Sequence, residues 1–141
     1  MSKVNVRDYS RVSDLLKEIR KLDCEIKVGV YSNEPEIIIR ANVNEYGSEI
    51  IPERSFIRGT FDEEINKMNI MAQRAVDNVI NGADADDQIE DIAEYLVRAV
   101  KEKIQNIGPP NAPETVEIKQ GNDPLVDTGD LLDSIDYEVV R

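Results

Sequence analysis

The stretch that decides the fold is Asn44–Arg58, NEYGSEIIPERSFIR, which is neither a clean helix nor a clean strand. Gly47 permits a positive φ and therefore a sharp change of direction. Pro52 fixes its own φ and favours an extended conformation at Ile51. The residues therefore predict a bend between two regular elements.

Charged side chains flank this bend, with Glu45 before it and Arg54 and Arg58 after it. We expect an ion pair between Glu45 and one of the two arginines. Connecting segments rich in anchors often carry function, but an ordinary ordered loop between a sheet and a long helix has the same local chemistry. Both interpretations stay open on these residues alone. The apolar anchors of the bend are Tyr46, Ile50, Ile51, Phe56 and Ile57.

The composition is that of a single domain. A chain of 141 residues is long enough to bury a core of useful size. It has no apolar run of about 18 residues, so we expect no transmembrane helix, and its first residues do not resemble a signal peptide. Cys24 is the only cysteine and histidine is absent, which removes a disulfide framework, the commonest general base and the commonest metal ligand.

The net charge of −12 argues against a broad nucleic-acid-binding surface. Such a charge repels polyanions, which suits a protein that lets DNA pass without holding it. It also suits any acidic cytosolic protein, and from the charge alone this second interpretation is favoured.

The N-terminal third predicts a helix and a β-hairpin. Apolar residues at helical spacing predict a helix over 11–22, with Ser10 as its N-cap. Alternation over 25–30 predicts a strand, and the β-branched run 36–39 predicts a second, antiparallel strand, so that the hairpin spans 25–40. The residues after it also fit a short helix that ends at Gly47.

Two long helices follow the bend. Thr60 and Glu63 fit a capping box at the start of a helix over 61–81, which Asn81 and Gly82 end. A second apolar stripe predicts a helix over 86–107. Because the connection between them is short, we expect an antiparallel helical hairpin.

The C-terminal segment 108–141 is a loop rich in Pro, Asn and Gly that ends in a strand over 135–140. The sequence therefore predicts one α+β domain over 1–141. A small mixed or antiparallel sheet packs in it against the long helical hairpin and the N-terminal helix.

Two acidic clusters are candidate metal or catalytic sites. Asp84, Asp86 and Asp87 lack the Gly and Glu that a calcium loop requires at its sixth and twelfth positions, so helix capping is favoured. Carboxylates also recur every three residues near the C-terminus, where a solvated acidic face is favoured over magnesium or acid–base chemistry. We expect no catalytic residue, no cofactor and no metal, and hence no enzyme. The second cluster consists of Asp127, Asp130, Asp133 and Asp136.

Two stretches together resemble the neck, head–tail joining or tail-completion proteins of tailed bacteriophages, a family often called virion morphogenesis proteins. The family pattern is an acidic residue, an aromatic residue and Gly, then Ile-Pro-x-Arg-Pro-Phe, and late in the chain Pro-Leu-x-Asp-Thr-Gly-x-Leu-x-x-Ser-Ile. The chain departs from it at Ser55, where Pro is usual, and at Asp130 and Asp133, where basic or neutral residues are common. The stretches are Asn44–Gly47 with Ile51–Arg58, and Asn111–Thr115 with Lys119, Pro124–Leu131 and Ser134–Tyr137.

The resemblance implies a structural virion protein that forms a ring at the head–tail junction and leaves a channel for DNA. It implies a hexamer, with a dodecamer as the alternative. The partners would be a portal-side connector or head-closure protein and a tail terminator or tail tube protein, with no membrane. The location would be the virion neck, after assembly in the host cytoplasm. Rival functions are a tail terminator ring, a soluble assembly chaperone and a small metal-dependent enzyme.

The residues expected to lock the bend or to contact neighbouring copies lie in both stretches. Those in the second stretch are expected to shape the C-terminal turn beside the sheet. The full set is Glu45, Tyr46, Gly47, Pro52, Arg54, Phe56, Arg58, Asp127, Thr128 and Gly129.

Overall fold

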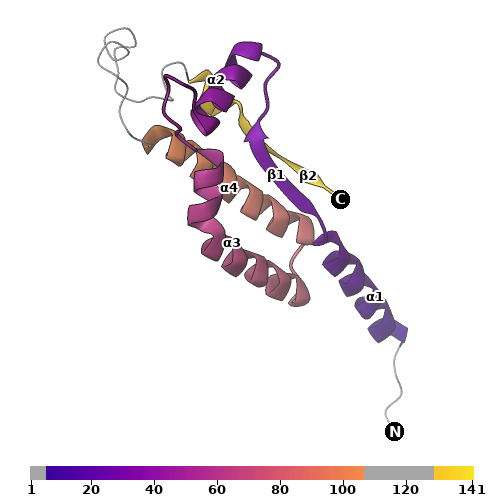
Figure 1. Ribbon diagram of the computed structural model, residues 1–141. Coiled ribbons are helices and arrows are strands. Elements are labelled where there is room, and N and C mark those ends of the chain that lie inside the picture. The colour runs from indigo at the N-terminus through magenta and orange to yellow at the C-terminus, as the bar shows by residue number, and fades with distance from the viewer. Residues whose placement is uncertain (1–5, 107–128) are drawn as a thin grey trace.

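The computed structural model describes residues 6–106 and 129–141 and has the predicted α+β architecture (Figure 1). The sheet and the helical hairpin form the body of the molecule, and α1 extends away from it. The elements are α1 (Val6–Lys21), β1 (Glu25–Val30), α2 (Pro35–Tyr46), α3 (Ile57–Ile80), α4 (Ala85–Asn106), α6 (Asp130–Asp133) and β2 (Ile135–Val140).

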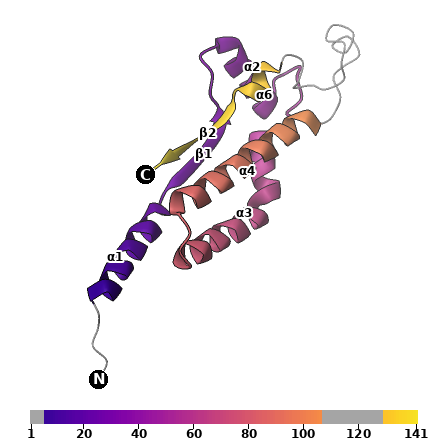
Figure 2. The same cartoon turned by 180° about the vertical axis from the view of Figure 1, so that it is seen from behind.

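The sheet is the antiparallel pair of β1 and β2, whose register runs from Glu25 opposite Val140 to Val30 opposite Ile135. Just past this pair, the Tyr31 amide donates to the Ser134 carbonyl at 2.7 Å. One face of the pair packs on α4, as both ribbon views show (Figures 1 and 2). The C-terminal segment therefore closes onto the first strand, as the alternating pattern predicts.

The helices α3 and α4 form the predicted antiparallel hairpin. The Asp84 carboxylate accepts the Asp87 amide at 3.1 Å, which caps the start of α4. The capping interpretation of this acidic cluster is therefore confirmed. The turn before it uses Gly82 at a φ of +106°, a conformation that favours glycine.

One buried cluster joins the sheet, α2, the start of α3 and the C-terminal half of α4. Phe56, Val100 and Ile104 are fully buried in it. Its members come from α2, α4, α6, β2 and the residue before α3, and partly buried side chains of β1 and α3 pack against them, so this cluster ties the chain together. They are Ile37, Ala41, Phe56, Val100, Ile104, Leu131 and Ile135.

The predicted second strand over 36–39 is wrong, because these residues belong to helix α2. Pro35 occupies the first turn of α2, where its missing amide hydrogen costs nothing, and Glu36 is placed favourably at the positive end of the helix. Ile37 and Ala41 lie four residues apart and form the buried face. The hairpin expected over 25–40 is thus a strand followed by a helix, and this helix ends at Gly47 as the alternative predicted.

Two helices begin earlier than predicted. α1 begins at Val6 and not after Ser10, since the residues before Ser10 include no Gly or Pro to stop it. α3 begins at Ile57, and Thr60 lies inside its first turn, where its hydroxyl donates to the Phe56 carbonyl. The expected capping box of Thr60 and Glu63 is therefore wrong, and the acceptor that begins α3 comes from elsewhere.

Candidate functional site

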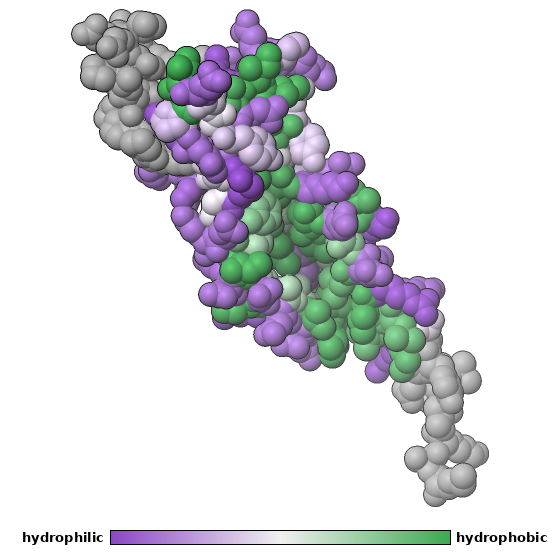
Figure 3. Space-filling model, viewed as in Figure 1, coloured by the Kyte–Doolittle hydropathy of each residue, from purple (hydrophilic) through white to green (hydrophobic). Residues whose placement is uncertain are grey.

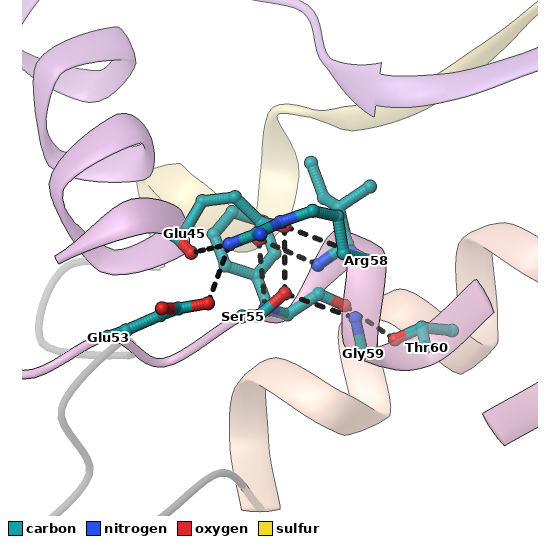
Figure 4. A network of polar contacts seen from close by, with 8 residues as sticks. Glu45, Glu53, Ser55, Arg58, Gly59 and Thr60 are labelled. Carbon is teal, nitrogen blue, oxygen red and sulfur yellow. Dashed lines mark hydrogen bonds and ion pairs between the residues drawn. The ribbon is translucent and has the colours of Figure 1, made fainter. Parts of the chain in front are cut away.

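The Glu45 carboxylate lies at the end of α2 and accepts the backbone amides that begin α3 (Figure 4). It accepts the amides of Phe56 at 3.0 Å, Ile57 at 2.9 Å and Arg58 at 2.9 Å. These amides have no partner within their own helix, and a negative charge is stabilised at a helix N-terminus. Glu45 is only 5% exposed, so a buried charge is fully provided with hydrogen bonds here.

Two side chains of the next segment complete this arrangement, which we call the Glu45 clamp. The Ser55 hydroxyl donates to Glu45 Oε1 at 2.9 Å and accepts the Gly59 amide at 3.1 Å. The Arg58 Nε donates to the same carboxylate oxygen at 3.0 Å, and its guanidinium also pairs with Glu53 at 2.7 Å. The predicted ion pair is confirmed in its Glu45–Arg58 form.

The environment of the clamp lowers the pKa of Glu45. Burial on its own raises that pKa, but the hydrogen bonds from the Ile57 and Arg58 amides, from Ser55 and from the Arg58 side chain outweigh it. The Glu45 carboxylate in turn raises the pKa of Arg58. The clamp therefore holds both groups in their charged forms.

Gly47 makes the bend that brings the two sides of the clamp together. Its φ is +78°, and a Cβ atom added there would lie 3.0 Å from the Glu53 backbone nitrogen. Just beyond, the Arg54 amide donates to the Asn44 carbonyl at 2.6 Å. The predicted change of direction at Gly47 is therefore confirmed, while Pro52 lies exposed in the loop that the bend closes.

The predicted residues of the first stretch divide into an inner and an outer group. Arg54 and Phe56 are buried, and Phe56 belongs to the core cluster. Tyr46 is exposed, and the Arg58 guanidinium lies 4.5 Å from its ring centroid in a cation–π contact. A neighbouring chain would therefore meet Tyr46 and Arg58 but not Phe56.

In the second stretch, Gly129 adopts the left-handed conformation, with a φ of +68°, and begins α6. The predicted residues Asp127 and Thr128 lie outside the described residues. Further on, Leu131 and Ile135 enter the same core cluster as Phe56. The first stretch and the described end of the second, distant in the sequence, therefore meet in one hydrophobic core.

Sequence reasoning missed the roles of Ser55 and Glu53. Ser55 was noted only because the family usually has Pro there, yet its hydroxyl is part of the clamp. A usable signal was its position four residues before Gly59, whose amide it accepts at the start of α3. The exposed Glu53 gave no such signal.

A polar hollow of about 610 Å³ lies between α3 and α4. Several of its polar groups contact one another: Tyr95 donates to Glu64 at 2.6 Å, Lys67 lies 4.4 Å from the Tyr95 ring centroid, and Lys103 pairs with Glu63. Across residues 6–106 and 129–141, no group of three or more acidic or cysteine side chains is arranged to hold a metal ion. Nor does any helix in these ranges have the length and apolarity needed to span a membrane.

An apolar groove of about 410 Å³ opens between the end of α1, β1 and the helical hairpin. Figure 3 shows apolar side chains gathered over α1 and α3 on this side of the molecule. The groove is lined by Leu22, Cys24, Ile26, Phe61, Ile65, Met68, Asn69, Ala72, Ala75, Val76, Ile89, Ile92 and Leu96.

Compared with known proteins, the chain matches no family model, no curated protein and no solved structure. The fold is an α+β domain in which the first stretch and the described end of the second share one core.

Proposed function

We propose that the protein is a structural component of the head–tail junction of a tailed bacteriophage, where copies form a closed ring around the DNA channel. The observation that carries this proposal is the meeting of the two motif stretches in one core. Phe56 of the first stretch packs in the same cluster as Leu131 and Ile135 of the second. The described parts of a pattern spread over the chain thus pack together, which supports the resemblance to neck proteins.

The surface supports self-association. Each chain has an apolar groove and, on α1, half-exposed apolar side chains. These α1 side chains do not line the groove of their own chain. A ring needs two different surfaces on each copy that fit together and close by rotation. The net charge of −12 would keep the assembled copies from holding the DNA that passes through them.

A cryo-EM map of the virion of the encoding phage or prophage tests the proposal. We expect a ring of this chain between the portal-side connector or head-closure protein and the tail. A ring that instead caps the tail tube itself would assign the chain as a tail terminator. The absence of this chain from purified particles, measured by mass spectrometry, would contradict a structural role and favour an assembly chaperone.

Calorimetry with Mg²⁺, Ca²⁺ and Mn²⁺ tests the enzyme alternative. We expect no saturable binding to the isolated protein. Saturable micromolar binding would contradict the purely structural role and favour a metal-dependent activity.

A further inference from the structure

The part of α1 before Glu18 has an apolar stripe without cover in its own chain. Val12 is 54% exposed and Leu16 is 47% exposed. Both ribbon views show this part of the helix extending past the turn of the helical hairpin (Figures 1 and 2). A single exposed apolar side chain is ordinary, but two on one face of a projecting helix form a surface that favours a partner.

The C-terminal end of α1 is fixed, so the stripe does not reach the groove of its own chain. Glu18 accepts the Ala85 amide at 2.9 Å, which attaches α1 to the start of α4. Lys21 pairs with Glu18 and lies 3.8 Å from Asp86. Only Leu22, just after the end of α1, lines the groove from this side.

The groove and the helix match in length and chemistry. The wall of the groove along α3, from Phe61 to Val76, is about 22 Å long, and the part of α1 before Glu18, twelve residues from Val6 to Lys17, spans about 18 Å and fits within it. Both surfaces are apolar, and α1 carries five basic and three acidic residues, a net charge of +2. The other residues of the chain together carry −14, so α1 is attracted to the body of another copy.

We propose that the part of α1 before Glu18 of one copy lies in the apolar groove of the next copy. This inference rests on the proposed ring, because it names the contact through which copies associate. The helix of one chain and the groove of the next are different surfaces. The contact is therefore heterologous and repeats from copy to copy. The apolar stripe and the groove cover each other, and the basic helix lies against an acidic neighbour.

Disulfide cross-linking tests this contact, because the native Cys24 lines the groove. The variants Val12→Cys and Leu16→Cys place a second thiol on the stripe. Within one chain Val12 lies about 13 Å and Leu16 about 7.5 Å before the end of α1 at Lys21. Cys24 is three residues further on, so both positions lie beyond the roughly 7 Å that a disulfide can bridge between Cα atoms. Backbone hydrogen bonds from Leu22 and Asp23 to Ile19 and Arg20 keep Cys24 at the far end of the helix.

On mild oxidation, we expect at least one of these variants to give a ladder of covalent multimers on a non-reducing gel. Asp14→Cys, exposed on the opposite side of α1, is the matched control and should stay at the background of the native protein. In each stripe variant, adding Cys24→Ser should abolish the ladder. Dimers that persist without Cys24 would mean that two α1 helices pair with each other, and would overturn the proposal.

Native mass spectrometry of the unoxidised protein separates this inference from the proposed function. A closed ring without cross-links would overturn the α1 contact and leave the ring in place. The absence of both the cross-links and a ring would count against both.

Discussion

Glu45 supplies from α2 the hydrogen-bond acceptors that the first turn of α3 lacks. Its carboxylate binds three consecutive backbone amides, the Ser55 hydroxyl and the Arg58 guanidinium. Hydrogen bonds to a charged group are stronger than those between neutral groups, and amides left buried without a partner are costly. A single side chain therefore determines where the long helix begins and how it meets the preceding one.

Replacing Glu45 by Gln should destabilise the fold by about 2–3 kcal/mol. The amide keeps the size of the side chain but loses the charge, and its NH₂ group would face backbone amides that also donate. Urea unfolding at neutral pH measures the difference. Glu53→Gln is the control, because Glu53 pairs with the same Arg58 from an exposed position and its loss should cost under about 1 kcal/mol. Equal losses in both variants would contradict a special role for Glu45.

Acid should remove the contribution of Glu45. Its pKa is lower in the folded protein than the ordinary value of 4.5, so the unfolded chain binds the proton more tightly. The stabilisation is therefore fully present above that ordinary value and is lost as the pH falls through the folded pKa. Denaturant titrations at decreasing pH should show a shallower acid decline in Glu45→Gln than in the native protein. Identical slopes would contradict the lowered pKa.

Gly47→Ala should destabilise the protein by about 1–3 kcal/mol. The residue has a positive φ, and the new Cβ would also press on the Glu53 backbone. Gly82→Ala is a matched comparison, since Gly82 also has a positive φ but open space around its Cα. The difference in unfolding free energy between the two variants measures the steric part. No loss at Gly47 would mean that the backbone does not depend on this bend.

At the scale of the elements, the start of α4 depends on Asp84. Asp84→Ala should cost about 0.5–2 kcal/mol, because the Asp87 amide loses its acceptor. Hydrogen exchange of the first turn of α4 should increase together with this loss. Asp91→Ala, on the exposed face of the same helix, should change neither quantity appreciably. Equal effects at both positions would rule out capping as the cause.

The sequence predicts those elements whose signals are local. Three such signals are the apolar stripe of α4, the alternation of β1 and β2, and the short turn at Gly82. Each depends on residues that are neighbours in the sequence, and each predicted element appears in the structure. The run of isoleucines at 37–39 indicated a strand because β-branched residues favour strands. In the structure these residues are helical, because Ile37 packs in the core from one face of the helix and Pro35 fits its first turn.

The candidate site was predictable only in part, for the same reason. Opposite charges around a glycine were enough to predict that Glu45 pairs with Arg54 or Arg58, and the structure selects Arg58. The start of α3 was misplaced, since its acceptor lies 11 to 13 residues upstream on another helix. A capping box is a local pattern, and Thr60 with Glu63 satisfied the pattern without being the cap.

At the scale of the whole molecule, association should be separable from stability. Ile65 lines the groove and is 51% exposed, whereas Ile70 is 49% exposed on the same helix and does not line it. Ile65→Asp should abolish the ring in native mass spectrometry, because the groove would then hold an uncompensated charge. Ile70→Asp should leave the ring intact. Both variants should unfold at similar urea concentrations, and equal loss of the ring would contradict the groove as its contact.

The closed geometry of the bend has a practical consequence for imaging. The Asn44–Arg54 backbone hydrogen bond and the Glu45 clamp hold the two ends of the bend together, while Ile50 at its tip is 90% exposed. A short peptide tag inserted beside Ile50 would be attached to the body of the molecule at a fixed position and would leave the packing of the helices unchanged. Antibody fragments bound to such tags would mark one fixed point on every subunit and so report how each subunit is oriented in a particle.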